Sequence, residues 1–460
     1  MHFLGVDVGS SFIKGAVLDV DSAAVSHVER TAAPEPVGGL EPTFREVDPD
    51  AFLEGTRLVL ERLHRHAPDA AGVVLCSQLH GTLLCDGEAR PLGRFVTWQD
   101  TRTLLPPPGA GESCFDEIER LVGPDDRRLL GNERVPGLPI NQLYWLARHG
   151  LMPAGAIPAT LPFFVAARLC RAPVACDITQ GYGQGAVNVR TLDWHRPVLE
   201  RLGLDRLAWP RIVPQGAVVG EWSHDGRSLP VYAPVGDYHC SQVGALLQPD
   251  ELSVNVSTGS AVIRIAQGCE MGDFQTRPWF DGTYLKTITH IPGGRALNAL
   301  LKLLGELAAA EGVTLRDPWG TVLARATQVA DGGGLEVDPA FYAGSMGDHG
   351  TIANLREDNM TVGHLCHALF AGMADNYARA AARVAPERDW SRLVFSGGVA
   401  LKAPLLRRLI MDRLGSRHRL APVEEDTLFG LLVLARAFAG RSPSVADAIA
   451  SVSPLVTTRS

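Results

Sequence analysis

Two segments of the chain, one at its start and one just past its middle, share a plan of strand, small polar turn and strand. The pattern places Leu4, Val6 and Val8 in register with Leu252, Val254 and Val256, and Asp7 opposite Asn255. Short alternating runs also arise by chance, but one such hairpin at the start of each half predicts two related domains. The expected strands cover residues 3–8 and 12–18 in the first hairpin, and residues 252–256 and 261–265 in the second.

The length of the chain favours the same division, because 460 residues exceed what one hydrophobic core usually supports. Strand patterns such as residues 72–76 alternate with helical patterns, which indicates an α/β fold. The turn at residues 248–250 gives the boundary, although composition does not change there. We expect domains of residues 1–247 and 248–460 with a ligand-binding cleft between them. The longer helices are expected over residues 141–149, 297–311, 362–384, 404–413 and 427–439.

Charge and hydropathy narrow the range of partners. The net charge of −8 has no basic stripe for nucleic acid or for anionic lipid. The start of the chain lacks a basic leader, and the aliphatic run near residues 428–439 is too short to span a bilayer, so we expect a cytoplasmic protein. Its eight scattered cysteines predict reduced, buried thiols. The sequence leaves the oligomeric state open, with a homodimer as one option.

Both hairpin tips carry small residues that suit polyphosphate, because glycine and small hydroxyls let backbone N–H groups approach it. The first tip offers Gly9, Ser10 and Ser11 with Lys14 nearby, and the second offers residues 257–260, including Thr258 and Gly259. Asp7 is placed to hold Mg²⁺ through water. Each tip taken alone is more often an ordinary hairpin turn, and it is their pairing that favours a phosphate site.

Two glycine pairs in the second half stand before expected helices. Gly293 and Gly294 precede the helix at residue 297, and Gly397 and Gly398 follow an apparent strand. Flat adenine can lie against such backbone, yet glycine turns from strand to helix are also a common joint in α/β proteins. Both interpretations stay open for both pairs.

Asp237 stands at the start of an expected helix. One interpretation is an ordinary N-cap, a role that Asp fills well. The other is a general base that takes a proton from an attacking hydroxyl, held in place and kept ionised by the helix N-terminus. The two roles are compatible.

Two polar segments that follow hydrophobic strands suit sugar binding. They supply planar side chains that make paired hydrogen bonds, together with one aromatic face. Such residues can also be plain surface, but their density at a strand end favours binding. The candidates are Gln78, His80, Trp98, Gln99, Asp100 and Arg102. His364 and His367, without a third ligand nearby, are expected to be structural and not a metal pair.

In this order the motifs resemble the FGGY family of carbohydrate kinases over nearly the whole chain. They are the Asp7 hairpin, Gln78-Leu79-His80-Gly81, Trp98-Gln99-Asp100-x-Arg102, Gly236-Asp237, Ser257-Thr258-Gly259-Ser260, Gly293-Gly294 and Ser396-Gly397-Gly398. The resemblance implies two actin-like (ribonuclease H-like) ATPase domains that flank a central cleft and close on a sugar and MgATP.

The resemblance also implies a role for each matching position. Asp237 would be the catalytic base and Asp7 the acid near Mg²⁺. The phosphates would face Ser10, Ser11, Lys14 and Thr258, the four glycines Gly293, Gly294, Gly397 and Gly398 would surround the nucleotide, and the six sugar-side candidates would contact the acceptor.

Two segments depart from the family pattern and bear on the choice of sugar. Residues 344–350 replace a common Gly-Glu-Arg segment, and residues 161–164 replace a common Asp-Tyr pair. Residues 97–102 and 360–369 look most like those of sedoheptulokinases, so sedoheptulose is the expected acceptor, with xylulose next and glycerol poor. A rival function is an actin-like ATP-binding switch without sugar transfer, which has no need of the groups around His80, Trp98 and Asp237.

Overall fold

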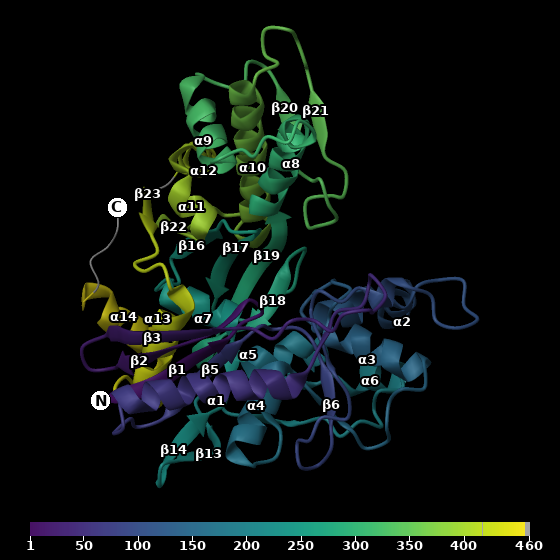
Figure 1. Cartoon of the computed structure of the whole chain (residues 1–460), viewed down its shortest axis with the longest axis vertical. Helices are drawn as coiled ribbons and strands as arrows, with labels where there is room; N and C mark the ends of the chain where they lie inside the picture. Colours follow the sequence, from purple (N-terminus) through teal and green to yellow (C-terminus); the bar gives the residue numbers. More distant parts are fainter. Residues whose placement is uncertain (416, 456–460) are drawn as a thin grey trace.

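Two mixed β-sheets, one from each half of the chain, organise the computed structural model, which describes residues 1–415 and 417–455 (Figure 1). The first sheet runs in the order β13-β14-β5-β1-β2-β3, with β15 beside β5. Its strands are β1 (His2–Val8), β2 (Phe12–Asp19), β3 (Ala24–Ala32), β5 (Val73–Ser77), β13 (Val218–His224), β14 (Arg227–Tyr232) and β15 (Val235–Gly236). The second runs in the order β18-β19-β17-β16-β22-β23. Its strands are β16 (Glu251–Asn255), β17 (Gly259–Ala266), β18 (Gln275–Pro278), β19 (Tyr284–Pro292), β22 (Arg392–Ser396) and β23 (Arg417–Leu420).

The two predicted hairpins occupy equivalent places in these sheets. β1 pairs antiparallel with β2 and parallel with β5, and β16 pairs antiparallel with β17 and parallel with β22. Asp7 faces Lys14 across the first hairpin, and Asn255 faces Ala261 across the second. The predicted repeat is therefore present as a shared topology.

Strand alternation divides most of the buried apolar residues into three large cores, because successive side chains point to opposite faces of a sheet. Leu4, Val6 and Val8 belong to a core on the outer face of the first sheet, and the equivalent Leu252, Val254 and Val256 to a core on the outer face of the second. The opposite faces, including Phe3 and Ile263, share a third core between the sheets.

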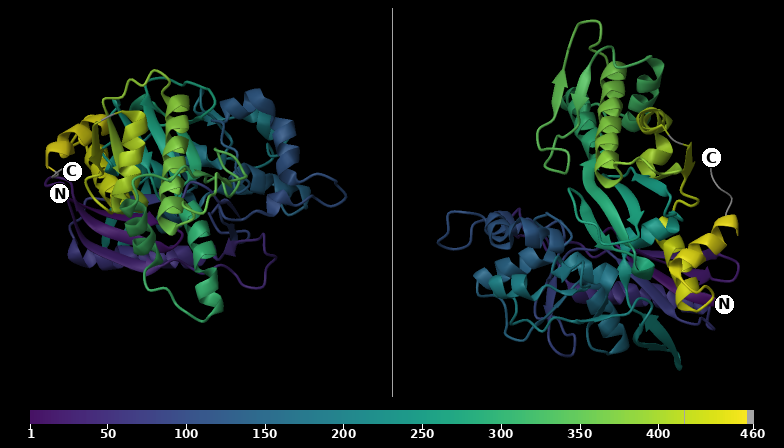
Figure 2. Two further views of the ribbon diagram at one scale, coloured as in Figure 1. Left: turned by 90° about the horizontal axis from the view of Figure 1, so that it is seen from above. Right: turned by 180° about the vertical axis from the view of Figure 1, so that it is seen from behind.

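Helices cover the outer faces, as the two lobes of Figure 2 show. Helices α1 (Pro49–His66) and α4 (Leu161–Cys170) pack on the first sheet, and α10 (Val362–Val384) packs on the second. The other helices of the second lobe are α8 (Gly294–Ala310), α9 (Pro318–Gln328), α11 (Gly398–Lys402) and α12 (Pro404–Leu414). In the first lobe, α2 (Cys114–Leu129), α3 (Pro139–Arg148) and α6 (Arg196–Arg201) lie to the side of the large sheet, where short two-stranded sheets also lie. Helix α5 (Ile178–Gly181), which contacts β15, is followed by the 3₁₀ turn η2 (Tyr182–Gln184).

Two helices cross in the shared core. They are α7 (Asp237–Gly244) and α13 (Asp426–Phe438). A Cβ on Gly244 would lie 1.8 Å from the Asp426 carbonyl oxygen, and one on Gly430 would lie 1.9 Å from that of Cys240. Glycine at both positions is what lets the two backbones touch.

The end of the chain returns to the first lobe. Figure 1 shows α13 and α14 (Val445–Val452) beside β1 and β2, although most of the second half lies in the other lobe. The strands change from one sheet to the other between Gly236 and Glu251. The domain boundary between residues 247 and 248 stays a prediction. It cannot describe α13 and α14, which follow it in the sequence but lie with the first lobe.

The predicted helices agree with the structure except at some ends. α10 has the predicted bounds because the Thr361 side chain accepts the N–H of His364. α8 begins three residues earlier than expected because the carbonyl oxygens of Ser257 and Thr258 accept the N–H groups of Gly294 and Arg295.

No helix among the described residues is both long and apolar enough to cross a membrane. All eight cysteines are free thiols, and six of them are buried.

Candidate active site

Three carboxyl groups from three elements form the centre of the site. Asp7 lies near the end of β1, and Asp237 and Asp426 are the first residues of the crossing helices α7 and α13. Burial and, to a lesser extent, the nearby Asp7 carboxylate raise the pKa of Asp237 to about 7. Burial likewise raises the pKa of Asp7 to about 6 and that of Asp426 to about 6. Asp237 is therefore poised to take up a proton near neutral pH.

Asp237 does not serve as the helix cap. Gly236 occupies the cap position, and Asp237 follows it as the first helical residue. Its Oδ1 accepts the N–H of Tyr238 at 2.6 Å, which leaves Oδ2 free of any such bond in the described residues. The position is compatible with the predicted base and rules out the simple capping interpretation.

The first hairpin tip is tied to the start of α13. Lys14 donates to Glu425 at 2.9 Å, and the Thr427 hydroxyl donates to Asp7 at 3.1 Å. Ser10 and Ser11 are exposed, and Gly9 donates its N–H to the Phe12 carbonyl oxygen to close the turn. The predicted phosphate-side residues of the first half therefore surround Asp7, with Lys14 neutralised by Glu425.

The predicted nucleotide-side residues of the second half also meet at one place. A Cβ on Gly293 would lie 2.6 Å from the Ser257 carbonyl oxygen, and one on Gly397 would lie 2.5 Å from that of Val256. Gly259 and Gly398 face open space, with no atom within 4 Å of an added Cβ. Thr258, Gly259 and the glycine pairs 293–294 and 397–398 thus form one surface built of backbone, as adenine and phosphate binding require.

On the opposite side, the loop after β5 lies against the start of α7. A Cβ on Gly236 would lie 2.5 Å from the Leu79 side chain, so the segment from Gln78 to His80 is a direct neighbour of Asp237. His80 Nδ1 bonds to the Gly183 carbonyl oxygen at 3.0 Å, and burial lowers the pKa of His80. Gln78 is buried, with no partner for its Oε1. A neutral imidazole in this segment has one donor and one acceptor nitrogen, which suits the hydroxyls of a polyol.

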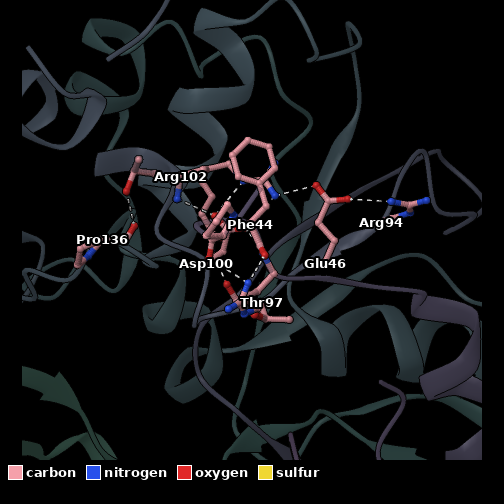
Figure 3. A network of polar contacts seen from close by, with 11 residues as sticks. Phe44, Glu46, Arg94, Thr97, Asp100, Arg102 and Pro136 are labelled. Atoms are coloured by element: carbon pink, nitrogen blue, oxygen red, sulfur yellow. Dashed lines mark hydrogen bonds and ion pairs between the residues drawn. The ribbon is translucent and has the colours of Figure 1, made fainter. Parts of the chain in front are cut away.

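The second sugar-side loop is shown in Figure 3. Trp98 and Gln99 are exposed, whereas Asp100 and Arg102 are buried against each other. Arg102 Nε and Nη2 donate to the two oxygens of Asp100 at 2.9 and 2.8 Å, and Nη2 also donates to Glu46 at 2.7 Å. The centre of the Phe44 ring lies 4.1 Å from the guanidinium carbon of Arg102.

These internal partners change the expected role of two candidates. Asp100 accepts the N–H of Arg45 as well, so both of its oxygens are already bonded. We therefore assign Asp100 and Arg102 to positioning the loop, in place of the direct sugar contact expected from the sequence. The loop presents Trp98 and Gln99, and an antiparallel bridge between Thr82 and Val96 holds it beside the His80 segment.

The structure adds charged residues that the sequence analysis missed. Glu133 and Arg277 form a buried ion pair at 2.8 Å between the loop after α2 and strand β18. The Arg277 guanidinium lies 4.3 Å from the Tyr238 ring. Asp426 was missed too, because a carboxylate at the start of a helix is a common cap, and only the crossing of α7 and α13 brings it to Asp237. None of these residues belongs to a local motif.

The carboxyl groups fit Mg²⁺ that is bound mainly by water and phosphate. No group of three ligating side chains among residues 1–415 and 417–455 could hold a metal ion by itself. Mg²⁺ commonly uses one or two carboxylates together with waters and substrate phosphates. Asp7 and Asp237, with Asp426 nearby, supply such oxygens, and burial is the main cause of the raised pKa values of Asp7 and Asp237.

Comparison with known proteins finds similarity to carbohydrate kinases. Residues 2–230 match the model of the N-terminal domain of the FGGY family of carbohydrate kinases. A xylulose kinase of Escherichia coli (strain K12) is 23% identical over 281 residues, which covers 58% of this chain and 54% of that protein. A glycerol kinase of Chloroflexus aurantiacus is 26% identical over 322 residues, which covers 65% of this chain and 62% of that protein. The match spans about half the length of the xylulose kinase.

Solved structures resemble the whole chain. A gluconate kinase from Lactobacillus acidophilus has a TM-score of 0.84 at 17% identity and covers 100% of this chain and 92% of that one. A xylulose kinase from the same organism has a TM-score of 0.82 at 17% identity, with 100% and 93% covered. This likeness confirms the predicted α/β fold with two actin-like domains.

Proposed function

Because the first half of this chain belongs to the FGGY family of carbohydrate kinases, we propose that the protein transfers the γ-phosphoryl group of ATP to a primary hydroxyl of a ketose. The observation that carries the proposal is the position of Asp237. It begins α7 next to the His80 segment and faces Asp7 beside the first hairpin tip. A base between sugar-side and phosphate-side groups is what transfer to a hydroxyl requires.

In the proposed reaction, Asp237 accepts the proton of the attacking hydroxyl. The hydroxyl oxygen forms a bond to the γ-phosphorus while the bond to the β,γ-bridging oxygen breaks, and ADP leaves. Phosphoryl transfer depends mainly on positioning and on charge stabilisation. Asp237 therefore has to ionise, and its environment places that ionisation near pH 7.

The other candidates have roles on either side of this base. Ser10, Ser11, Lys14 and Thr258 would face the phosphates, and Lys14 has to leave Glu425 to do so. Asp7 would hold Mg²⁺, which neutralises charge on the phosphates when bound. Glycines 259, 293, 294, 397 and 398 would lie against the nucleotide. Gln78, His80, Trp98 and Gln99 would contact the sugar.

The acceptor we propose is a ketose, and the relatives change the order of candidates. Their names give xylulose and glycerol as substrates, whereas sedoheptulose was expected from residues 97–102 and 360–369. We now place xylulose first and sedoheptulose second. A site built on hydrogen bonds discriminates by hydroxyl pattern before chain length. The proposed reaction uses cytosolic ATP, so we propose a cytoplasmic location. We propose no nucleic-acid or membrane partner, and a homodimer stays an option.

A coupled ADP-release assay tests the proposal across xylulose, sedoheptulose, ribulose, gluconate, glycerol and aldoses. We expect the highest kcat/KM for a ketose and a loss of its turnover in Asp237→Asn. ADP release that no acceptor stimulates would instead favour the ATP-binding switch. Highest activity with glycerol or an aldose would overturn the choice of acceptor and leave the kinase function standing.

A further inference from the structure

The buried pair Glu133–Arg277 joins the two halves of the chain beside the proposed base. Glu133 lies in the loop after α2 of the first lobe, and Arg277 lies in β18, the edge strand of the second sheet. Their side chains are 1% and 2% exposed. The same two segments are held by backbone contacts, because Thr276 donates its N–H to the Gly131 carbonyl oxygen at 3.0 Å.

Strand β18 holds α7 at the residues that follow Asp237. Arg277 lies over the Tyr238 ring, and the next residue, Pro278, accepts a bond from His239 Nε2 at 2.9 Å. The Tyr238 hydroxyl bonds to Thr287 of β19 at 2.6 Å. The first turn of the helix that carries the base is therefore fixed by the second lobe.

A continuous line of contacts leads from Arg277 to the sugar side. Glu133 accepts from Arg277 and, at 3.3 Å, from the Tyr182 hydroxyl. Tyr182 precedes Gly183, whose carbonyl oxygen bonds to His80. His80 and Asp237, the two groups expected on either side of the acceptor, are thus connected through Tyr182, Glu133, Arg277 and Tyr238.

The pair is poorly arranged for stability alone. Glu133 Oε1 and Arg277 Nε are buried without a hydrogen-bond partner. A buried ion pair stabilises a fold only when good geometry and further bonds offset desolvation.

We propose that Glu133 and Arg277 are positioning residues for the kinase reaction, which set the relative place of Asp237 and His80 by holding α7 to the second lobe. The inference rests on the proposed function. Arg277 fits the role because a planar guanidinium can stack on Tyr238 while it donates to Glu133, a combination that lysine cannot reproduce. The role is one of positioning because the contacts of the pair are with each other, with Tyr182 and with Tyr238.

The test compares Arg277→Lys and Glu133→Gln with Arg419→Lys. Arg419 is a matched control because it also forms a buried pair, with Glu251 at 2.6 Å, and it bonds to carbonyl oxygens beyond the far end of α7. With the best acceptor, we expect kcat/KM of the two Glu133–Arg277 variants to fall by about 10²-fold, as misplacement of a reacting group predicts. The loss should lie in kcat, with the KM for ATP unchanged.

Hydrogen exchange gives a readout that needs no activity. We expect Arg277→Lys to remove protection from the amides of Cys240 to Gln242, which bond to carbonyl oxygens at the start of α7, and Arg419→Lys to leave those amides protected. An equal loss of kcat in Arg419→Lys would reduce the pair to a structural role. Unchanged protection at Cys240 to Gln242 in both pair variants would overturn the proposal. A wild-type protein inactive on every sugar would refute the proposed function instead, and the exchange result would still decide the positioning of α7.

Discussion

Replacement of the proposed base by its neutral isostere, Asp237→Asn, should make the protein more stable and inactive. Burial and the Asp7 charge raise the pKa of Asp237 from its ordinary 3.8 to about 7. At 1.36 kcal/mol for each pKa step, this corresponds to at most about 4 kcal/mol. Solvent at the partly exposed carboxyl screens the charges, so we expect about 1–3 kcal/mol.

The sign of the effect follows from proton binding. A raised pKa means that the folded protein binds the Asp237 proton more tightly than the unfolded chain does, so stability falls as pH rises from about 4 to about 7. Asparagine has no proton to lose, and its Oδ1 can keep the bond from the Tyr238 N–H. The variant should therefore gain stability at pH 8 and none at pH 4.

Thermal melting at pH 8, 6 and 4 measures this difference, with Asp205→Asn as the exposed control. Turnover should fall by about 10²- to 10⁴-fold, the usual contribution of a general base. In the wild type, kcat/KM should fall as pH drops below about 7, because Asp237 becomes protonated. A variant that melts below the wild type at pH 8, or that differs from it equally at pH 4, would refute the charge argument. Retained turnover would refute the base.

Three further changes test other parts of the structure. Gly430→Ala places a methyl group 1.9 Å from the Cys240 carbonyl oxygen and should cost roughly 1–3 kcal/mol or more, whereas Gly305→Ala, with 3.6 Å to Leu315, should be neutral or stabilising in melting experiments. Arg102→Met breaks the buried pair with Asp100 and should lower the free energy of unfolding by about 3–5 kcal/mol. It should also raise the KM for the acceptor more than the KM for ATP, and the exposed Arg94→Met is the control. Sugar together with a non-hydrolysable ATP analogue should give a smaller radius in solution scattering than either ligand alone, because the two lobes each carry one hairpin tip.

The sequence could predict the features that lie within one segment. The alternating residues of both hairpins and the glycine pairs before helices are local patterns, and the structure places them where the patterns indicate. Asp237 could be placed at the start of a helix because Gly236 and the polar first turn mark a boundary. The C-terminal end of α8 was predicted to within one residue. Its start was predicted three residues too late, because carbonyl oxygens of the second hairpin tip accept the first N–H groups of that helix.

Features that depend on contacts between distant segments could not be predicted. Asp426 reaches Asp237 only because Gly244 and Gly430 let two helices touch. Glu133 and Arg277 are 144 residues apart and have no motif around them. Asp100 was expected to bind the sugar because the sequence does not show that the N–H of Arg45, in another segment, already donates to its carboxylate.

The two hairpins differ at the equivalent positions of Asp7 and Asn255, and this difference follows the chemistry proposed for each side of the site. Asp7 faces Lys14, while the equivalent Asn255 faces Ala261 and donates to the Ser396 hydroxyl at 2.9 Å. A second carboxylate at position 255 would repel a polyphosphate that lies against the glycines of that half, because like charges at close range are unfavourable. Under the proposed function, the hairpin of the first half thus supplies an acid near the base and Mg²⁺, and the hairpin of the second half supplies neutral donors and bare backbone. On this argument Asn255→Asp should weaken ATP binding, and it should do so less as salt screens the added charge. Titration of an ATP analogue at low and high ionic strength measures this effect, and equal affinity of the two proteins at low salt would contradict it.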